Sequence, residues 1–239
     1  VGWIPGGLGH ANVVASIIFA GMSGSAAADA GGLGTIEMEA MTKNGYDEDF
    51  SGAVTAASSV IGPIFPPSIP LIIYGATASV SVAKLFMGGV LPGLLMGVAL
   101  MVLVFLFAIK YKFERHPFRM AALVRQFFGS ILSLITPLII LAGFTTGWFT
   151  PTEASSIAVA YSLIIALIVY RTMDWKTFTD CLLESAITSA NTLFIIGTST
   201  LFTYVLVKEG ASAEIASFIL GISQNPAVIL FIINVVLLI

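Results

Sequence analysis

The sequence predicts an all-α polytopic membrane protein built around a re-entrant helical hairpin and a proline-broken helix. Its 239 residues are 57% hydrophobic and 10% charged, and the mean hydropathy is +1.01. So few polar side chains cannot cover the surface of a soluble globule of this size. Apolar stretches of about 20 residues, the length that a helix needs to cross the bilayer, recur along the chain. We therefore expect one transmembrane domain over residues 1–239.

The first element, residues 9–43, is predicted to be the re-entrant hairpin. Its apolar arm at 10–22 is roughly 20 Å long at 1.5 Å per residue, too short to cross a ~30 Å core. The run "SGSAAADAGGLG" follows, and its glycines give the backbone the freedom to turn. Such a turn is tolerated at membrane depth where protein or a water-filled cavity surrounds it. The alternative is one long helix over 10–36 with a glycine-rich packing face.

The second element, residues 51–75, is predicted to be a broken helix. It holds four prolines, at positions 63, 66, 67 and 70. Each lacks an N–H group, and its ring crowds the carbonyl four residues earlier. We therefore expect free carbonyls at Ser59, Gly62, Pro63 and Pro66. Buried carbonyls without partners are costly, and an alkali cation would satisfy them. The alternative is a proline kink stabilised by neighbouring helices.

The third element is a series of spanning helices between residues 85 and 207. Uninterrupted apolar segments at 85–109, 129–149, 153–170 and 187–207 each have the length of a span. The basic loop "KYKFERHPFR" follows the first of them and lies in the cytoplasm by the positive-inside rule. The motif "FTPTEAS" predicts a helix start with a capping box between Thr150 and Glu153.

The hairpin tip and the broken helix together predict an ion site near the middle of the membrane. Ser23, Ser25 and Asp29 bring two hydroxyls and one carboxylate to the tip, and the break brings carbonyl oxygens. An all-oxygen site with one carboxylate suits sodium better than a transition metal. Carboxylates inside a membrane usually mark ion or proton pathways, and discontinuous helices are typical of secondary transporters. The alternative for Asp29 is a local cap of the hairpin.

Three separated motifs resemble the large membrane subunit of tripartite ATP-independent periplasmic (TRAP) transporters. They are "GHANVVASIIFAGMSGSAAADAGGLG", "TAASSVIGPIFPPSIPLIIYG" and "GWFTPTEASSIAVAYSLIIALIVYR". The resemblance covers essentially the whole chain and implies sodium-coupled import by an elevator-type movement in the bacterial inner membrane, without enzymatic activity. It implies a small membrane subunit and a periplasmic binding protein as partners. The binding protein would deliver a carboxylate substrate, of the C4-dicarboxylate or sialic-acid type.

The resemblance also assigns individual residues and an incomplete inverted repeat. The sodium ligands it implies are Ser23, Ser25, Asp29, Gly62, Phe65 and Pro67, and the substrate contacts are Ser58, Ser59 and Ser68. Residues 210–239 would form an interfacial helix and the first arm of a second hairpin. We expect the chain to be the central part of a longer protein. We expect contact with membrane lipid and none with nucleic acid, and no cofactor beyond the coupling Na⁺.

Two other functional classes remain to be weighed. A re-entrant loop with free carbonyls can form the filter of a passive channel, although filters usually need symmetric repetition around a pore. The motif "GMSG" around Ser23 is similar to the nucleophile turn of an intramembrane serine protease. Such chemistry needs a base within hydrogen-bond reach, and neither His10 nor His116 is predicted on a later span.

Overall fold

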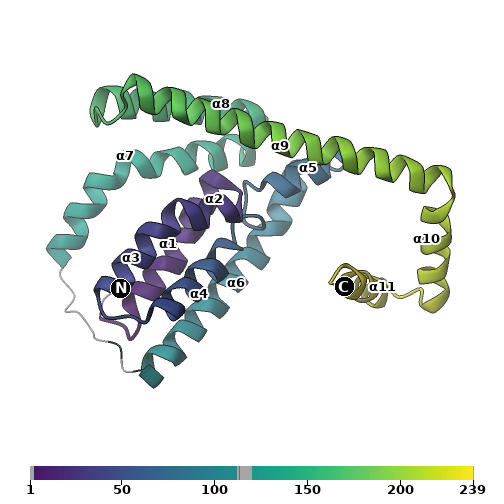
Figure 1. The fold of residues 1–239 in the computed structure, drawn as a ribbon, viewed down its shortest axis with the longest axis horizontal. Helices are drawn as coiled ribbons and strands as arrows, with labels where there is room; N and C mark the ends of the chain where they lie inside the picture. The colour runs from purple at the N-terminus through teal and green to yellow at the C-terminus, as the bar shows by residue number, and fades with distance from the viewer. Residues whose placement is uncertain (1–2, 112, 114–119, 239) are drawn as a thin grey trace. The chain divides into compact units, whose positions relative to one another are not determined.

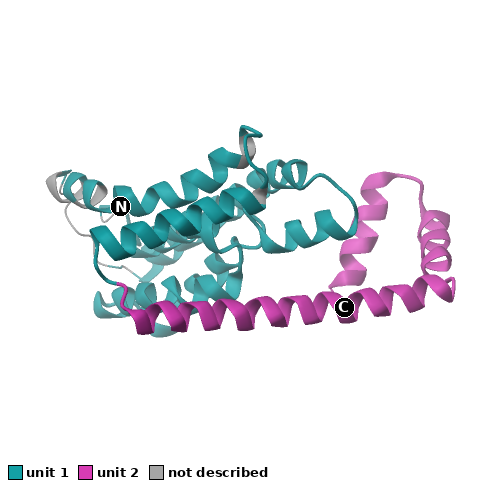
Figure 2. Cartoon of the chain, turned by 90° about the horizontal axis from the view of Figure 1, so that it is seen from above, with its two compact units in different colours: residues 1–172 teal, residues 173–239 magenta. Residues whose placement is uncertain are grey.

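The computed structural model describes residues 3–111, 113 and 120–238, and all its regular elements in that part of the chain are helices (Figure 1). The predicted all-α membrane class is confirmed. His116 and most of the basic loop lie outside the described residues. The contacts divide the chain into two compact units, residues 1–172 and 173–239 (Figure 2).

The first unit begins with a helical hairpin. Helix α1 (Gly7–Ser23) ends at Gly24, and α2 (Ala26–Gly31) and α3 (Leu33–Lys43) return beside it. Gly24 has φ 58°, in the left-handed region where side chains other than glycine are strained. This turn ends α1 and excludes the alternative of one continuous helix over residues 10–36.

The predicted break lies between α4 (Glu48–Ser59) and α5 (Ile69–Thr77). Asp47 caps the start of α4 and Ser68 caps the start of α5. The expectation of free carbonyls is wrong for Ser59 and Pro63, because local turns use them. The Ser59 carbonyl accepts from the Gly62 N–H at 3.1 Å, and the Pro63 carbonyl accepts from the Ser68 hydroxyl.

The rest of the first unit consists of long apolar helices. These are α6 (Val82–Tyr111), α7 (Met120–Thr145) and α8 (Pro151–Ile164), which continues as the π-turn η1 (Ile165–Val169). Helix α7 ends earlier than the predicted 149, and Gly147 follows with φ 73°. The capping box is confirmed: the Thr150 N–H donates to Glu153 Oε2 at 2.8 Å, and Thr150 Oγ1 accepts from the Glu153 N–H at 3.3 Å.

The second unit consists of α9 (Trp175–Lys208), α10 (Ala211–Ile222) and α11 (Pro226–Leu237). Helix α9 starts well before the predicted span at 187–207, because Asp174 caps it and neither glycine nor proline interrupts residues 175–186. The hydrogen bonds from Thr177 hold the pKa of the Asp174 carboxyl below its usual range. Among the described residues, α9 joins α6 and the 152–169 segment as helices long and apolar enough to cross a membrane.

The core of the first unit lies where the hairpin and α4 pack on α6. Val13, Val54, Ile61 and Val104 form a buried cluster shared by α1, the α4 end and α6. In Figure 1, α1, α3 and α4 run side by side with α6 next to them, in agreement with their contacts. A second cluster of Phe86, Ile140 and Ala158 joins α6, α7 and α8.

Candidate functional site

The hairpin tip lies directly against the broken helix. The Gly24 carbonyl accepts from the Ile69 N–H at 3.4 Å. A Cβ atom added to Gly24 would stand 2.7 Å from the Pro67 carbonyl oxygen, and one added to Gly62 would stand 3.5 Å from the Ser25 nitrogen. The distance at Gly24 leaves no room for a side chain, whereas 3.5 Å at Gly62 is an ordinary van der Waals contact between the two backbones. The structure therefore brings together the two segments whose oxygens were predicted to form an ion site.

Helix α6 carries the hairpin and the break at different places along its length. Gly9, near the base of the hairpin, packs on Val104, and Gly6 packs on Ala108. The break packs on an earlier part of the same helix, where Phe65 contacts Gly93. At 1.5 Å per residue, the helix from Gly93 to Ala108 is roughly 22 Å long. The break therefore lies roughly 22 Å along α6 from the place where the base of the hairpin packs on it.

The predicted ligands of the tip occupy different local positions. Ser23 is the last residue of α1, and its hydroxyl accepts from the Ser25 N–H at 3.4 Å. Ser25 caps α2 by accepting from the Ala28 N–H at 3.4 Å. Both hydroxyl oxygens thus lie at the tip. Gly62 and Pro67 contact this turn as described above, whereas the Phe65 side chain packs against α6. Within the described residues, no hydrogen bond reaches the carbonyl of Gly62.

The protease interpretation finds no support in this arrangement. His10 lies near the start of α1 and Ser23 at its end, roughly 20 Å apart at 1.5 Å per residue. A general base must lie within hydrogen-bond reach of the nucleophile. His10 is therefore too far from Ser23 to activate it, and His116 lies outside the described residues.

Asp29 lies on α2, one helical turn from Ser25, whose carbonyl accepts from the Asp29 N–H at 3.0 Å. Its side chain is 1% exposed, and neither carboxylate oxygen has a hydrogen-bond partner. The groups that interact with it electrostatically are the Ser16 hydroxyl on α1 and the Glu37 carboxylate on α3. Because Ser25 caps α2 and no backbone N–H donates to Asp29, the alternative role of Asp29 as a local cap is excluded.

A buried polar network that the sequence analysis did not identify joins α1 to α4. Asn12 Nδ2 donates to Thr55 Oγ1 at 2.8 Å, the Ser58 hydroxyl donates to Asn12 Oδ1 at 2.7 Å, and the Ser16 hydroxyl donates to Ser58 at 3.0 Å. All four side chains are buried. The signal in the sequence is the spacing, since positions 12 and 16, like 55 and 58, share one face of a helix.

The three serines assigned to the substrate are buried and already hydrogen-bonded. Ser58 belongs to the network just described, the Ser59 hydroxyl donates to the Thr55 carbonyl at 2.7 Å, and the Ser68 hydroxyl donates to the Pro63 carbonyl. Their exposed fractions are 0%, 2% and 0%. In this conformation these hydroxyls therefore hold the end of α4 and the start of α5 in place.

Close packing of the break depends on a stripe of glycines on α6. Gly89, Gly93 and Gly97 recur every fourth residue and are buried. A Cβ atom on Gly89 would come within 2.4 Å of the Ile64 carbonyl oxygen, and one on Gly97 within 2.6 Å of the Ile17 side chain. Small residues at this spacing let membrane helices approach closely. The spacing is visible in the sequence and could have located the face of α6 that carries the site.

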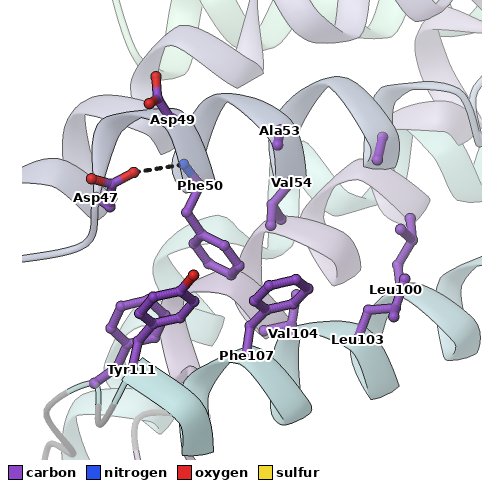
Figure 3. A pocket seen from close by; sticks show the side chains of 12 residues that line it. Asp47, Asp49, Phe50, Ala53, Val54, Leu100, Leu103, Val104, Phe107 and Tyr111 are labelled. Atoms are coloured by element: carbon purple, nitrogen blue, oxygen red, sulfur yellow. Dashed lines mark hydrogen bonds between the residues drawn. The ribbon is translucent and has the colours of Figure 1, made fainter.

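A separate apolar cavity of about 630 Å³ lies between α4 and the C-terminal part of α6 (Figure 3). The rings of Phe50, Phe107 and Tyr111 line one end, and Asp47 and Asp49 stand at its edge. Asp47 is engaged as a cap, accepting from the Phe50 N–H at 3.1 Å. The walls offer few oxygen ligands, so this cavity does not suit a cation.

The sequence matches a known family over its whole length. A profile described as "Tripartite ATP-independent periplasmic transporter, DctM component" matches residues 1–239. The chain is 43% identical to the sialic acid TRAP transporter large permease protein SiaM of Vibrio cholerae, covering all of this chain and 56% of that protein. It is 43% identical to the sialic acid TRAP transporter permease protein SiaT of Haemophilus influenzae, of which it covers 39%. It is 37% identical to the C4-dicarboxylate TRAP transporter large permease protein DctM of Pseudomonas aeruginosa, of which it covers 56%. In each comparison the chain thus spans about half or less of the relative's length.

Proposed function

Because the chain belongs to the DctM-component family of tripartite ATP-independent periplasmic transporters, we propose that it forms part of a sodium-coupled importer of small carboxylates. The observation that carries this proposal is the contact between the hairpin tip and the broken helix. Two half-helices that end there present hydroxyl and carbonyl oxygens, which is how secondary transporters hold their coupling ions. Relatives are named as permeases, so the chain is a transporter component and not an enzyme.

The proposed sodium site uses the oxygens of the tip and the break. Ser23 and Ser25 supply hydroxyls, and Gly62, Phe65 and Pro67 supply backbone carbonyls. Asp29 supplies the negative charge from inside the hairpin. The Gly62 carbonyl supports this assignment because no hydrogen bond reaches it within the described residues. A hard monovalent cation would satisfy such oxygens without thiolate or imidazole ligands.

The substrate and the partners follow from the relatives. Two of them are named for sialic acid and one for C4-dicarboxylates, so we propose a carboxylate substrate bound beside the break. Ser58, Ser59 and Ser68 would act there by positioning the backbone, since their hydroxyls are used within the protein. We further propose that the chain acts in the bacterial inner membrane together with a small membrane subunit and a periplasmic binding protein. Transport would proceed by an elevator-type movement.

The test is substrate uptake into liposomes that contain the complete transporter with its partner proteins. We expect saturable uptake that needs an inward sodium gradient. Asp29→Asn should lose this uptake or require a far higher sodium concentration. Glu39→Gln is the matched control, because Glu39 lies on the same hairpin but is 65% exposed and paired with Lys43. Uptake that ignores the sodium gradient would refute sodium coupling, and flux that does not saturate would favour a passive channel.

A further inference from the structure

The apolar cavity between α4 and α6 has an apolar end and a polar end (Figure 3). Leu100 lines one end, and the Phe107 ring lies between it and Tyr111 at the other. The carboxylates of Asp47 and Asp49 stand at the edge on the side of Tyr111, away from Leu100. A molecule that fills this cavity must therefore be apolar over most of its length and polar at one end.

The polar end of the cavity coincides with the end of the apolar part of α6. The uninterrupted apolar run of this helix stops at Ile109, and Lys110 and Tyr111 are the last residues of the helix. Charged side chains are costly inside hydrocarbon, and tyrosine rings are enriched at membrane interfaces. The polar end therefore belongs at the membrane surface, and the apolar end points toward the membrane interior.

The length of the cavity corresponds to the depth of one leaflet. Between Leu100 and Tyr111, α6 rises roughly 16 Å at 1.5 Å per residue. One leaflet is half of a hydrocarbon core of ~30 Å, or about 15 Å. The volume of about 630 Å³ falls in the range of roughly 300–1,000 Å³ that is typical of pockets for small molecules. An acyl chain that descends from a headgroup at the surface therefore fits the cavity in length and in direction.

The charges at the edge favour a headgroup that carries an ammonium group. Asp47 accepts from the Phe50 N–H at 3.1 Å and keeps its negative charge. In the part of the chain that the structure describes, the Asp49 carboxylate has neither a hydrogen bond nor an ion pair. Two carboxylates repel an anionic substrate or headgroup and attract an ammonium group, which aromatic rings attract as well. Lys110 supplies a positive charge at the same end of α6, where the phosphate of a phospholipid would lie.

We propose that this cavity binds one acyl chain of a phospholipid whose headgroup carries an ammonium group. The chain lies between α4 and α6, the ammonium group meets Asp47 and Asp49, and the phosphate lies toward Lys110. The walls of the cavity do not suit an inorganic cation, whereas its edge suits this organic one. The lipid site is separate from the proposed sodium and substrate sites, so each can be tested without the other.

A bound lipid would support the base of the hairpin. Phe50 lines the cavity, and its ring centroid lies 6.4 Å from that of Tyr46. The Tyr46 hydroxyl accepts from the Leu8 N–H at 3.4 Å, at the start of α1. An acyl chain against Phe50 therefore restrains the contact between α4 and the first turn of the hairpin. Binding of this lipid should raise the thermal unfolding midpoint.

The experiment uses the complete transporter purified in detergent. Native mass spectrometry counts the bound phospholipids, and the unfolding midpoint is measured after adding phosphatidylethanolamine or phosphatidylglycerol with the same acyl chains. Ala53 and Ala56 are both exposed on α4, but of the two only Ala53 lines the cavity. We expect Ala53→Trp to retain one phosphatidylethanolamine molecule fewer than Ala56→Trp. It should also lose most of the midpoint rise that this lipid produces.

A second set of variants tests the headgroup without filling the cavity. Asp47→Asn combined with Asp49→Asn removes both charges, and asparagine still caps a helix as well as aspartate does. This double variant should lose the preference of the wild type for phosphatidylethanolamine over phosphatidylglycerol. Glu48→Gln is the control, because Glu48 is exposed in the same turn but is not among the residues that line the cavity. It should keep the preference.

Three results would overturn the proposal. Equal lipid counts and equal midpoint rises in Ala53→Trp and Ala56→Trp would show that no lipid occupies the cavity. A wild type that binds the two lipids equally well would refute the assignment to an ammonium headgroup. Release of the small membrane subunit by Ala53→Trp, with an unchanged lipid count, would show that a protein partner fills the cavity instead.

Discussion

Two adjacent glycines on α6 allow a sharp test of how the broken helix is held. Gly88 is exposed, and a Cβ atom there would meet nothing within 4 Å. Gly89 is buried, and a Cβ atom there would stand 2.4 Å from the Ile64 carbonyl oxygen. Because both lie in the same helix, any intrinsic gain from replacing glycine by alanine is nearly equal at both positions. The difference between Gly88→Ala and Gly89→Ala therefore measures the clash with the break.

The size of the effect follows from that distance. Contacts between a carbon atom and a carbonyl oxygen are comfortable at about 3.3 Å or more, so α6 and the break must separate by about 1 Å. Overpacking of this kind costs about 1–3 kcal/mol. The break also holds the hairpin tip, through a hydrogen bond from Ile69 to Gly24 that is already 3.4 Å long. We therefore expect the displacement to open the tip as well.

The assay compares the two variants in the complete transporter. Gly89→Ala should lower the thermal unfolding midpoint relative to Gly88→Ala. It should also raise the sodium concentration needed for half-maximal uptake by about 5- to 150-fold, the factor equivalent to 1–3 kcal/mol when the whole cost falls on the sodium-bound state. Equal midpoints and equal sodium requirements for the two variants would show that the break is not held against α6 as described.

Three further substitutions test the tip, the network and the capping box. Gly45→Ala places a side chain at φ 81° in open space and should lower the free energy of unfolding by about 1 kcal/mol. Gly24→Ala adds a clash with the Pro67 carbonyl, so its unfolding midpoint should fall further than that of Gly45→Ala. Equal midpoints for the two variants would contradict the close approach at Gly24. Ser58→Ala leaves buried groups of Asn12 and Ser16 without a partner. The free energy of unfolding from denaturant titrations should fall by about 1–3 kcal/mol. An unchanged free energy of unfolding would contradict the network. Thr150→Ala removes the N-cap of α8 and should cost about 1 kcal/mol while leaving the sodium requirement of uptake unchanged.

The sequence by itself determined the class of the protein and the places where its helices start, turn or break. Composition and hydropathy predicted an all-α membrane protein because the bilayer tolerates only backbone that is satisfied within the protein. The prolines located the break, and the glycine-rich run located the turn of the hairpin, because both residue types act on their own backbone. The capping box at Thr150 was equally predictable, since its hydrogen bonds span only three residues.

Only the tertiary structure decided which polar groups meet. Ser59 and Pro63 were expected to have free carbonyls, yet a local turn and the Ser68 hydroxyl use them. Asp29 was expected at the tip, and only the structure shows that its side chain is buried without a hydrogen bond. The physical reason is that these contacts join separate helices. The angle of each turn and the closeness of each packing contact decide them, and neither can be read from the periodicity of one segment.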